Sequence, residues 1–277
     1  MAISTAQGKA EWGWAIATLV GIGATLAVNT LSNIFPPGGK AVGEIANTTL
    51  AGVLITPANY AFAIWGLIYG GLIAYGVYQL RCQRRHSRST DLNGHNSALV
   101  QESRILGAVS RLLLLACGAQ ILWIFLFTLQ FFTLSIVAML GILLPLMVAY
   151  LRLEIGQVPS RRARRWFVNY PFSVYLAWIS VATVINVASA LYAAGWQGWG
   201  LGPETWTVIM VAVTAAIAAV VVWQRRDVAF TLVYLWAYGA IAVRHSDQPL
   251  IWGSTAIAAA LLLALLGWRC TANPATR

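Results

Sequence analysis

Long, nearly uninterrupted apolar segments dominate the pattern of hydrophobic and polar residues along this chain. A run of 22 residues makes about 33 Å of helix, enough to cross about 30 Å of hydrocarbon. The pattern therefore predicts an all-α integral membrane protein with about eight spanning helices. The apolar runs lie at about residues 12–35, 58–80, 105–128, 130–151, 171–194, 205–223, 228–243 and 250–268.

The run at 228–243 is the shortest of these segments. It leaves little apolar length to spare for a complete span, because charged or titratable residues lie directly before and after it. These are Arg225, Arg226, Asp227, Arg244, His245 and Asp247.

Lys and Arg are distributed unevenly among the connections between the runs. With the N-terminus in the cytoplasm, the cytoplasmic segments hold fifteen of them and the outer loops hold only Lys40 and Arg244. Because cytoplasmic loops carry an excess of these residues, we expect both termini in the cytoplasm, with basic loops at 82–103 and 152–170. The fifteen are Lys9, Arg81, Arg84, Arg85, Arg88, Arg104, Arg152, Arg161, Arg162, Arg164, Arg165, Arg225, Arg226, Arg269 and Arg277.

Composition supports the bilayer as the solvent of this chain. Of the 277 residues, 59% are hydrophobic and 9% are charged, against about 25% charged in soluble domains. The net charge of +10 lies in short connections, so it reports topology and no nucleic-acid partner is expected. The cysteines, Cys82, Cys117 and Cys270, show no zinc-site or disulfide spacing.

Three of the runs carry aromatic and amide side chains at helical spacing. Trp65 and Tyr69 share one face of the second helix, which follows Pro57. In the third helix Gln120 precedes Trp123 by three residues. On spacing alone, Trp65 fits equally an interfacial aromatic belt, and Gln120 fits a polar residue that joins packed helices.

The fifth run contains the most informative of these patterns. Tyr175, Trp178 and Asn186 lie along one face of this helix. An asparagine in the middle of a membrane span requires a hydrogen-bond partner, because an unsatisfied amide is costly in hydrocarbon. Asn186 therefore indicates either a packing contact or a binding site.

Two segments resemble signatures of the TspO/MBR family, the tryptophan-rich sensory or translocator proteins. The segment from Pro57 to Tyr69 resembles the proline-led start of the family's second helix, and the run from Tyr175 to Asn186 resembles its Tyr-Leu-Ala-Trp…Ala-Thr…Asn motif. Gln120 stands where the family usually has Asn. Further departures are Ala58 for the second proline, Tyr60 one residue out of register with the loop tryptophan, and Val174 for the proline before Tyr175.

The resemblance implies a TspO-like five-helix transmembrane domain at residues 1–194, followed at 195–277 by about three additional transmembrane helices of unknown role. It also implies an aromatic pocket under the loop between the first two helices. No tightly bound cofactor is expected; porphyrin or haem is the candidate ligand, and a homodimer is compatible with this class. The residues that the resemblance places around the ligand are Pro57, Tyr60, Phe62, Trp65, Tyr69, Gln120, Trp123, Trp178 and Asn186.

The function expected from these features is a membrane ligand-binding or sensory protein that acts in stress responses or tetrapyrrole regulation. The alternative is a facilitative transporter of a hydrophobic or amphipathic solute, since no Asp or Glu lies deep in a run to relay protons. A further alternative, which the resemblance leaves open, is an enzyme that degrades bound porphyrin. No nucleophile–base pair or metal set is recognisable, so such chemistry would depend on the ligand and on the redox behaviour of tryptophan. A retinal protein is excluded by its need for a buried lysine: only Lys9 and Lys40 exist, both outside the runs.

Overall fold

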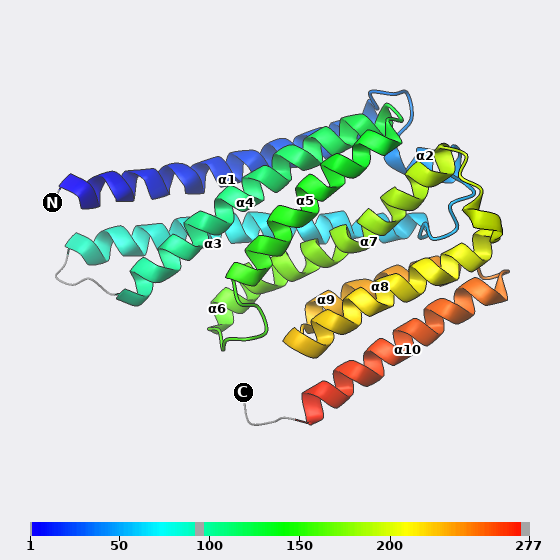
Figure 1. The fold of residues 1–277 in the computed structure, drawn as a ribbon. Helices are drawn as coiled ribbons and strands as arrows, with labels where there is room; N and C mark the ends of the chain where they lie inside the picture. The colour runs from blue at the N-terminus through cyan, green and yellow to red at the C-terminus, as the bar shows by residue number, and fades with distance from the viewer. Residues whose placement is uncertain (1, 92–96, 273–277) are drawn as a thin grey trace.

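A computed structural model, which describes residues 2–91 and 97–272, shows a bundle of long helices (Figure 1). Each predicted apolar run lies largely within one of them, which confirms the all-α membrane fold. The long helices are α1 (Ala2–Ile34), α3 (Ile64–Asp91), α4 (Ser97–Thr128), α5 (Phe132–Arg152), α7 (Tyr170–Ala193), α8 (Pro203–Arg225), α9 (Val228–Arg244) and α10 (Pro249–Thr271). The short elements are α2 (Val42–Asn47), η1 (Asn59–Ala63), α6 (Arg162–Arg164), the π-helix η2 (Arg165–Asn169) and η3 (Gly198–Gly200).

Seven helices of the described chain are long and apolar enough to cross a membrane. The eighth, α9, has 17 residues, as the crowding of charges around its run predicted. Its start is well defined, because Oδ1 of Asp227 accepts a hydrogen bond of 3.1 Å from the backbone N–H of Phe230. At 1.5 Å per residue α9 is about 26 Å long.

The loop predicted at 82–103 is wrong for most of its length. Helix α3 continues to Asp91 and α4 begins at Ser97, while residues 92–96 lie outside the described residues. Arg and Gln are good helix formers, so a helix can continue beyond its apolar run into water. Apolar length marks the part of a helix inside the membrane, and it does not mark where the helix ends.

The helices form two groups that meet along α7. Helices α1, α3, α4, α5 and α7 make one group, and α8, α9 and α10 make the other, in which α9 packs most extensively on α7 (Figure 1). The hydroxyls of Ser180 and Tyr234, 2.7 Å apart, join α7 to α9 within this contact.

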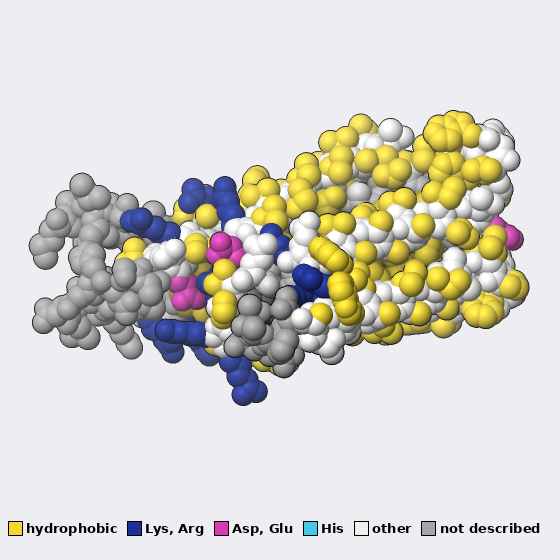
Figure 2. All heavy atoms as spheres, turned by 60° about the horizontal axis from the view of Figure 1, so that its bottom comes forward, with side chains coloured by type: hydrophobic (Ala, Val, Ile, Leu, Met, Phe, Trp, Pro, Cys, Tyr) yellow, Lys and Arg dark blue, Asp and Glu magenta, His cyan; other side chains and the backbone are white. Residues whose placement is uncertain are grey.

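Charge is concentrated at one end of the bundle. Figure 2 shows Lys and Arg side chains gathered towards the left end, while most of the remaining visible surface is hydrophobic. Helix α1 starts at the end of the bundle where α10 finishes (Figure 1), as an even number of crossings requires. The protein is therefore a multi-pass membrane protein with an arginine-rich end.

Candidate ligand-binding site

A cavity of about 420 Å³ lies among α1, α3, α4, α5 and α7, beneath the segment that connects α1 to α3. We call this connection, residues 35–58, the covering segment. Seven of the predicted site residues line the cavity, namely Pro57, Phe62, Trp65, Gln120, Trp123, Trp178 and Asn186. The structure thus brings together side chains from three separate parts of the chain, at residues 57–65, 120–123 and 178–186.

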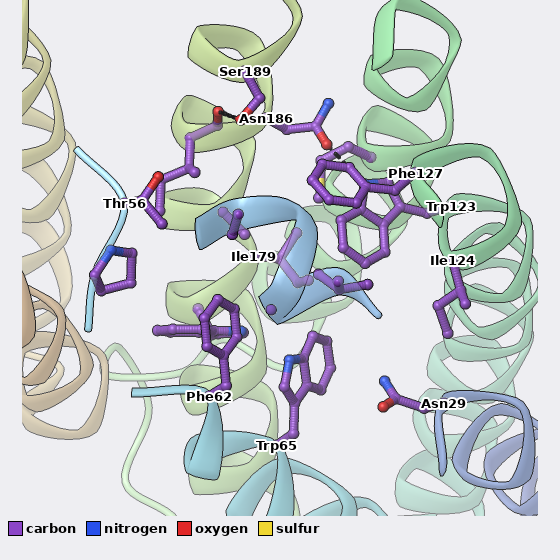
Figure 3. Close-up of a pocket in the computed structure, with 18 of the residues that line it drawn as sticks. Asn29, Thr56, Phe62, Trp65, Trp123, Ile124, Phe127, Ile179, Asn186 and Ser189 are labelled. Carbon is purple, nitrogen blue, oxygen red and sulfur yellow. Dashed lines mark hydrogen bonds between the residues drawn. The ribbon is translucent and has the colours of Figure 1, made fainter. Parts of the chain in front are cut away.

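Aromatic rings form the walls of the cavity. In Figure 3 Phe62 and Trp65 lie on one side and Trp123 and Phe127 on the other. Trp123 stacks on Phe127 at a centroid distance of 5.0 Å, and Phe62 meets Trp178 edge to face at 6.1 Å. These offset and perpendicular geometries are the favourable ones for aromatic pairs, so the walls are held in place by their own contacts.

Asn186 is engaged in packing within the site. Its Oδ1 accepts a hydrogen bond of 2.8 Å from Nε1 of Trp123, and its Nδ2 donates to Oγ of Ser135 at 3.0 Å. The asparagine is buried, so these bonds supply the partners that an amide in hydrocarbon requires. Asn186 therefore fixes the indole of Trp123 at the wall of the cavity.

Gln120 presents a polar atom with an open hydrogen-bonding position. Its Oε1 accepts a hydrogen bond of 3.2 Å from the hydroxyl of Tyr175, whereas its buried Nε2 finds no partner among the described residues. Buried polar groups are nearly always paired, so this N–H marks a position for an acceptor from a ligand or water.

Two predicted site residues do not line the cavity. Tyr69 is buried behind Trp65 and stacks on it at 5.6 Å. Tyr60 is 45% exposed, and its ring meets Trp236 of α9 edge to face at 5.2 Å. Tyr69 thus supports the wall from behind, while Tyr60 faces the last three helices.

Sequence reasoning missed the contribution of α1. Asn29, Ser32 and Asn33 line the cavity, and their i, i+3, i+4 spacing near the end of an apolar helix was the signal that could have found them. None of the described side chains that line the cavity is charged. The described residues also contain no group of three or more His, Cys, Asp or Glu that could hold a metal ion.

Helix α9 holds the covering segment in place. The guanidinium of Arg244 donates to Oδ1 of Asn47 at 2.8 Å and to the carbonyl of Pro57 at 3.3 Å. The backbone N–H of Ala58 donates to the carbonyl of Ala240 at 3.1 Å. Since Pro57 also lines the cavity, α9 reaches the site through the segment that covers it.

A further hydrogen bond from α9 extends this contact to η1, the short helix before α3. Nε1 of Trp236 donates to the carbonyl of Ala61 at 3.1 Å, one residue before the cavity residue Phe62. A helix of the last group therefore contacts both the covering segment and the short helix η1 that follows it.

The family model of TSPO-like proteins matches residues 15–268. The chain belongs to this family, which confirms the resemblance carried by its second and fifth helices. The match extends through α8, α9 and α10 as well as the first five spanning helices. No curated protein and no solved structure compared with the chain matches it.

Proposed function

We propose that this TspO-like membrane protein binds a flat, hydrophobic ligand of the porphyrin class in the cavity beneath the covering segment. The observation that carries the proposal is a neutral cavity of about 420 Å³ whose walls include Trp65, Trp123 and Trp178. Pockets of about 300–1,000 Å³ with apolar walls and a few polar groups are typical of small-molecule sites. Indole faces stack well on a planar macrocycle.

The polar features of the site support the same class of ligand. The free N–H of Gln120 supplies one directional contact inside a neutral cavity. The cations of the outer connections, Lys40 and Arg244, both bond to the covering segment, at Thr48 and Asn47. The carboxylates of a porphyrin would find positive charge at this end, while its ring occupied the aromatic part.

A ligand titration tests the proposal directly. The purified protein, in neutral detergent, is titrated with protoporphyrin, haem and a sterol while tryptophan fluorescence is recorded. We expect saturable quenching by the tetrapyrroles, because indoles line the cavity. Quenching that rises linearly with porphyrin concentration, or that equals the quenching of free tryptophan, would rule out a specific site.

The same ligands in liposomes separate binding from facilitative transport. Protein-dependent flux of a porphyrin across the membrane, abolished by substitution of the cavity tryptophans, would identify a transporter. Saturable binding without flux would leave a ligand-binding or sensory role.

A further inference from the structure

A second cleft lies at the arginine-rich end of the bundle, away from the aromatic cavity. It has a volume of about 710 Å³, and it opens between the loop at residues 155–160, the start of α7 and the adjoining ends of α8, α9 and α10. It therefore lies where the two groups of helices meet.

The cleft has a net positive lining. Arg165, Arg226 and Arg269 line it, and Asp227 is the one acid among its described lining residues. The carboxylate of Asp227 is occupied, since Oδ2 accepts from the hydroxyls of Tyr150 at 2.8 Å and Ser173 at 2.5 Å. With three arginines against one engaged carboxylate, the cleft favours an anion.

Asn169 provides a buried polar group that faces this cleft. It is 7% exposed, its Nδ2 donates to Oγ of Ser160 at 3.0 Å, and its Oδ1 has no partner among the described residues. The two ends of an amide are assigned from hydrogen bonding, so the reverse orientation is equally available. In that orientation the Ser160 hydroxyl donates to Oδ1, and the NH₂ group becomes a free donor in the lining of the same cleft as the arginines.

The backbone around the cleft has two uncommon features. Arg226 has a φ of 50°, in the left-handed region that favours glycine, yet the residue there is an arginine. Arg165 and Asn169 are the two ends of the π-helix η2, and such turns are frequent at functional sites. Both features place cleft residues at positions that regular helices would not supply.

Neighbouring tryptophans place the cleft at the depth of the lipid headgroups. The guanidinium of Arg269 lies 4.8 Å from the ring centroid of Trp223 and 6.0 Å from that of Trp268. Both indoles are about half exposed, and tryptophans of this kind mark the interface between membrane and water.

From these observations we propose that the cleft binds the phosphate group of an anionic phospholipid. Arg165, Arg226 and Arg269 would supply charge-assisted hydrogen bonds, and Asn169 would supply a neutral donor. Basic pockets between membrane helices suit such headgroups. A lipid in this position joins the start of α7 to the ends of α8 and α10, which stabilises the contact between the two groups of helices.

Native mass spectrometry of the protein in neutral detergent tests the proposal by titration with phosphatidylglycerol and phosphatidylcholine. The variants are Arg165→Gln and Arg226→Gly; the second keeps the left-handed turn because glycine favours it. We expect phosphatidylglycerol to bind preferentially and each variant to weaken it about fivefold. Arg152→Gln is the control, because Arg152 is exposed near the same end and does not line the cleft.

Each other result overturns the proposal. Equal binding of the two lipids would exclude an anionic headgroup. Equal weakening by Arg152→Gln would show that general surface charge is responsible. Displacement of the lipid by millimolar inorganic phosphate would show that the cleft takes a free phosphate. Melting temperatures measured on every variant ensure that only folded proteins are compared. The titration contains no porphyrin, so its result does not depend on the proposed ligand of the aromatic cavity.

Discussion

Arg244 donates a hydrogen bond of 2.8 Å to the side chain of Asn47, although 197 positions separate the two residues in the chain. Arg244 ends α9, and Asn47 ends α2 inside the covering segment. The relationship links the last group of helices to the cavity built by the first group. It gives α9 a specific place in the proposed binding site.

Substitution of Arg244 tests this link. Arg244→Gln removes charge-assisted bonds to Asn47 and Pro57, and we expect porphyrin affinity to fall about tenfold because the covering segment loosens. Hydrogen exchange provides a readout independent of the ligand: the amide of Ala58, bonded to Ala240, should exchange faster. Arg152→Gln, which removes an exposed charge at the opposite, arginine-rich end of the bundle and does not touch the cavity, is the control. Unchanged exchange and affinity in the folded variant would contradict the link.

The tryptophans of the cavity wall give a second prediction. Trp65→Leu and Trp178→Leu should each weaken porphyrin binding by about 1–3 kcal/mol, because both lose stacking surface. Their melting temperatures should change modestly. Trp199→Leu serves as the matched control, since Trp199 is 83% exposed and lies outside the cavity. If both wall variants kept the original dissociation constants while folded, the cavity would not be the binding site.

Asn186 should matter for stability as well as for the ligand. Asn186→Leu removes the oxygen that accepts from Nε1 of Trp123 and the N–H that donates to the hydroxyl of Ser135. We therefore expect the free energy of unfolding to fall by about 1 kcal/mol. Selectivity among porphyrins should also change, because the indole of Trp123 loses its anchor. Thr183→Val is the comparison, because among the described residues the Thr183 hydroxyl bonds only to the carbonyl of Ile179 in its own helix. Equal melting temperatures for the two variants would contradict this role.

His245, directly after α9, predicts a pH dependence. Burial, reinforced by the charge of Arg244, lowers the pKa of this imidazole below its ordinary value of 6.5, although a hydrogen bond with the backbone of Leu54 opposes the shift. The unfolded chain therefore binds the proton more readily than the folded one. The stability contributed by neutral His245 is fully present above pH 6.5 and is lost as pH falls towards the lowered pKa.

The melting temperature of the purified protein between pH 7.5 and 5 measures this effect. We expect it to fall with acidification, and we expect His245→Gln to reduce that fall because the variant carries no titrating group at this position. An identical pH profile for the variant would assign the acid sensitivity to other residues.

Membrane orientation is the fifth prediction. We propose that the arginine-rich end faces the cytoplasm, because positive loops are retained there. An impermeant thiol reagent should label Gln197→Cys in intact cells, whereas the exposed native Cys270 should react only after permeabilisation. Cys270→Ser identifies the signal of the native thiol. Labelling of Cys270 alone in intact cells would reverse the orientation.

The sequence by itself determined the membrane fold and much of the candidate site. Apolar length is a local property, so the runs located the spanning helices. The family resemblance carried by short motifs placed Trp65, Trp123 and Trp178 around one pocket, and these three rings line one cavity. The local pattern could not show where helices end in water. It therefore missed the extension of α3 to Asp91.

Only the tertiary structure decided which polar groups are satisfied and which segments meet. From the sequence, Asn186 is equally consistent with a ligand contact and with a packing residue. The structure places Trp123 and Ser135, which are 63 and 51 positions away in the chain, within hydrogen-bond distance of it. The hydrogen bond from Arg244 to Asn47 could not be predicted from the spacing of residues along the chain, because the two residues lie 197 positions apart in different segments. Contacts between distant residues depend on how helices pack, and that packing is a property of the whole chain.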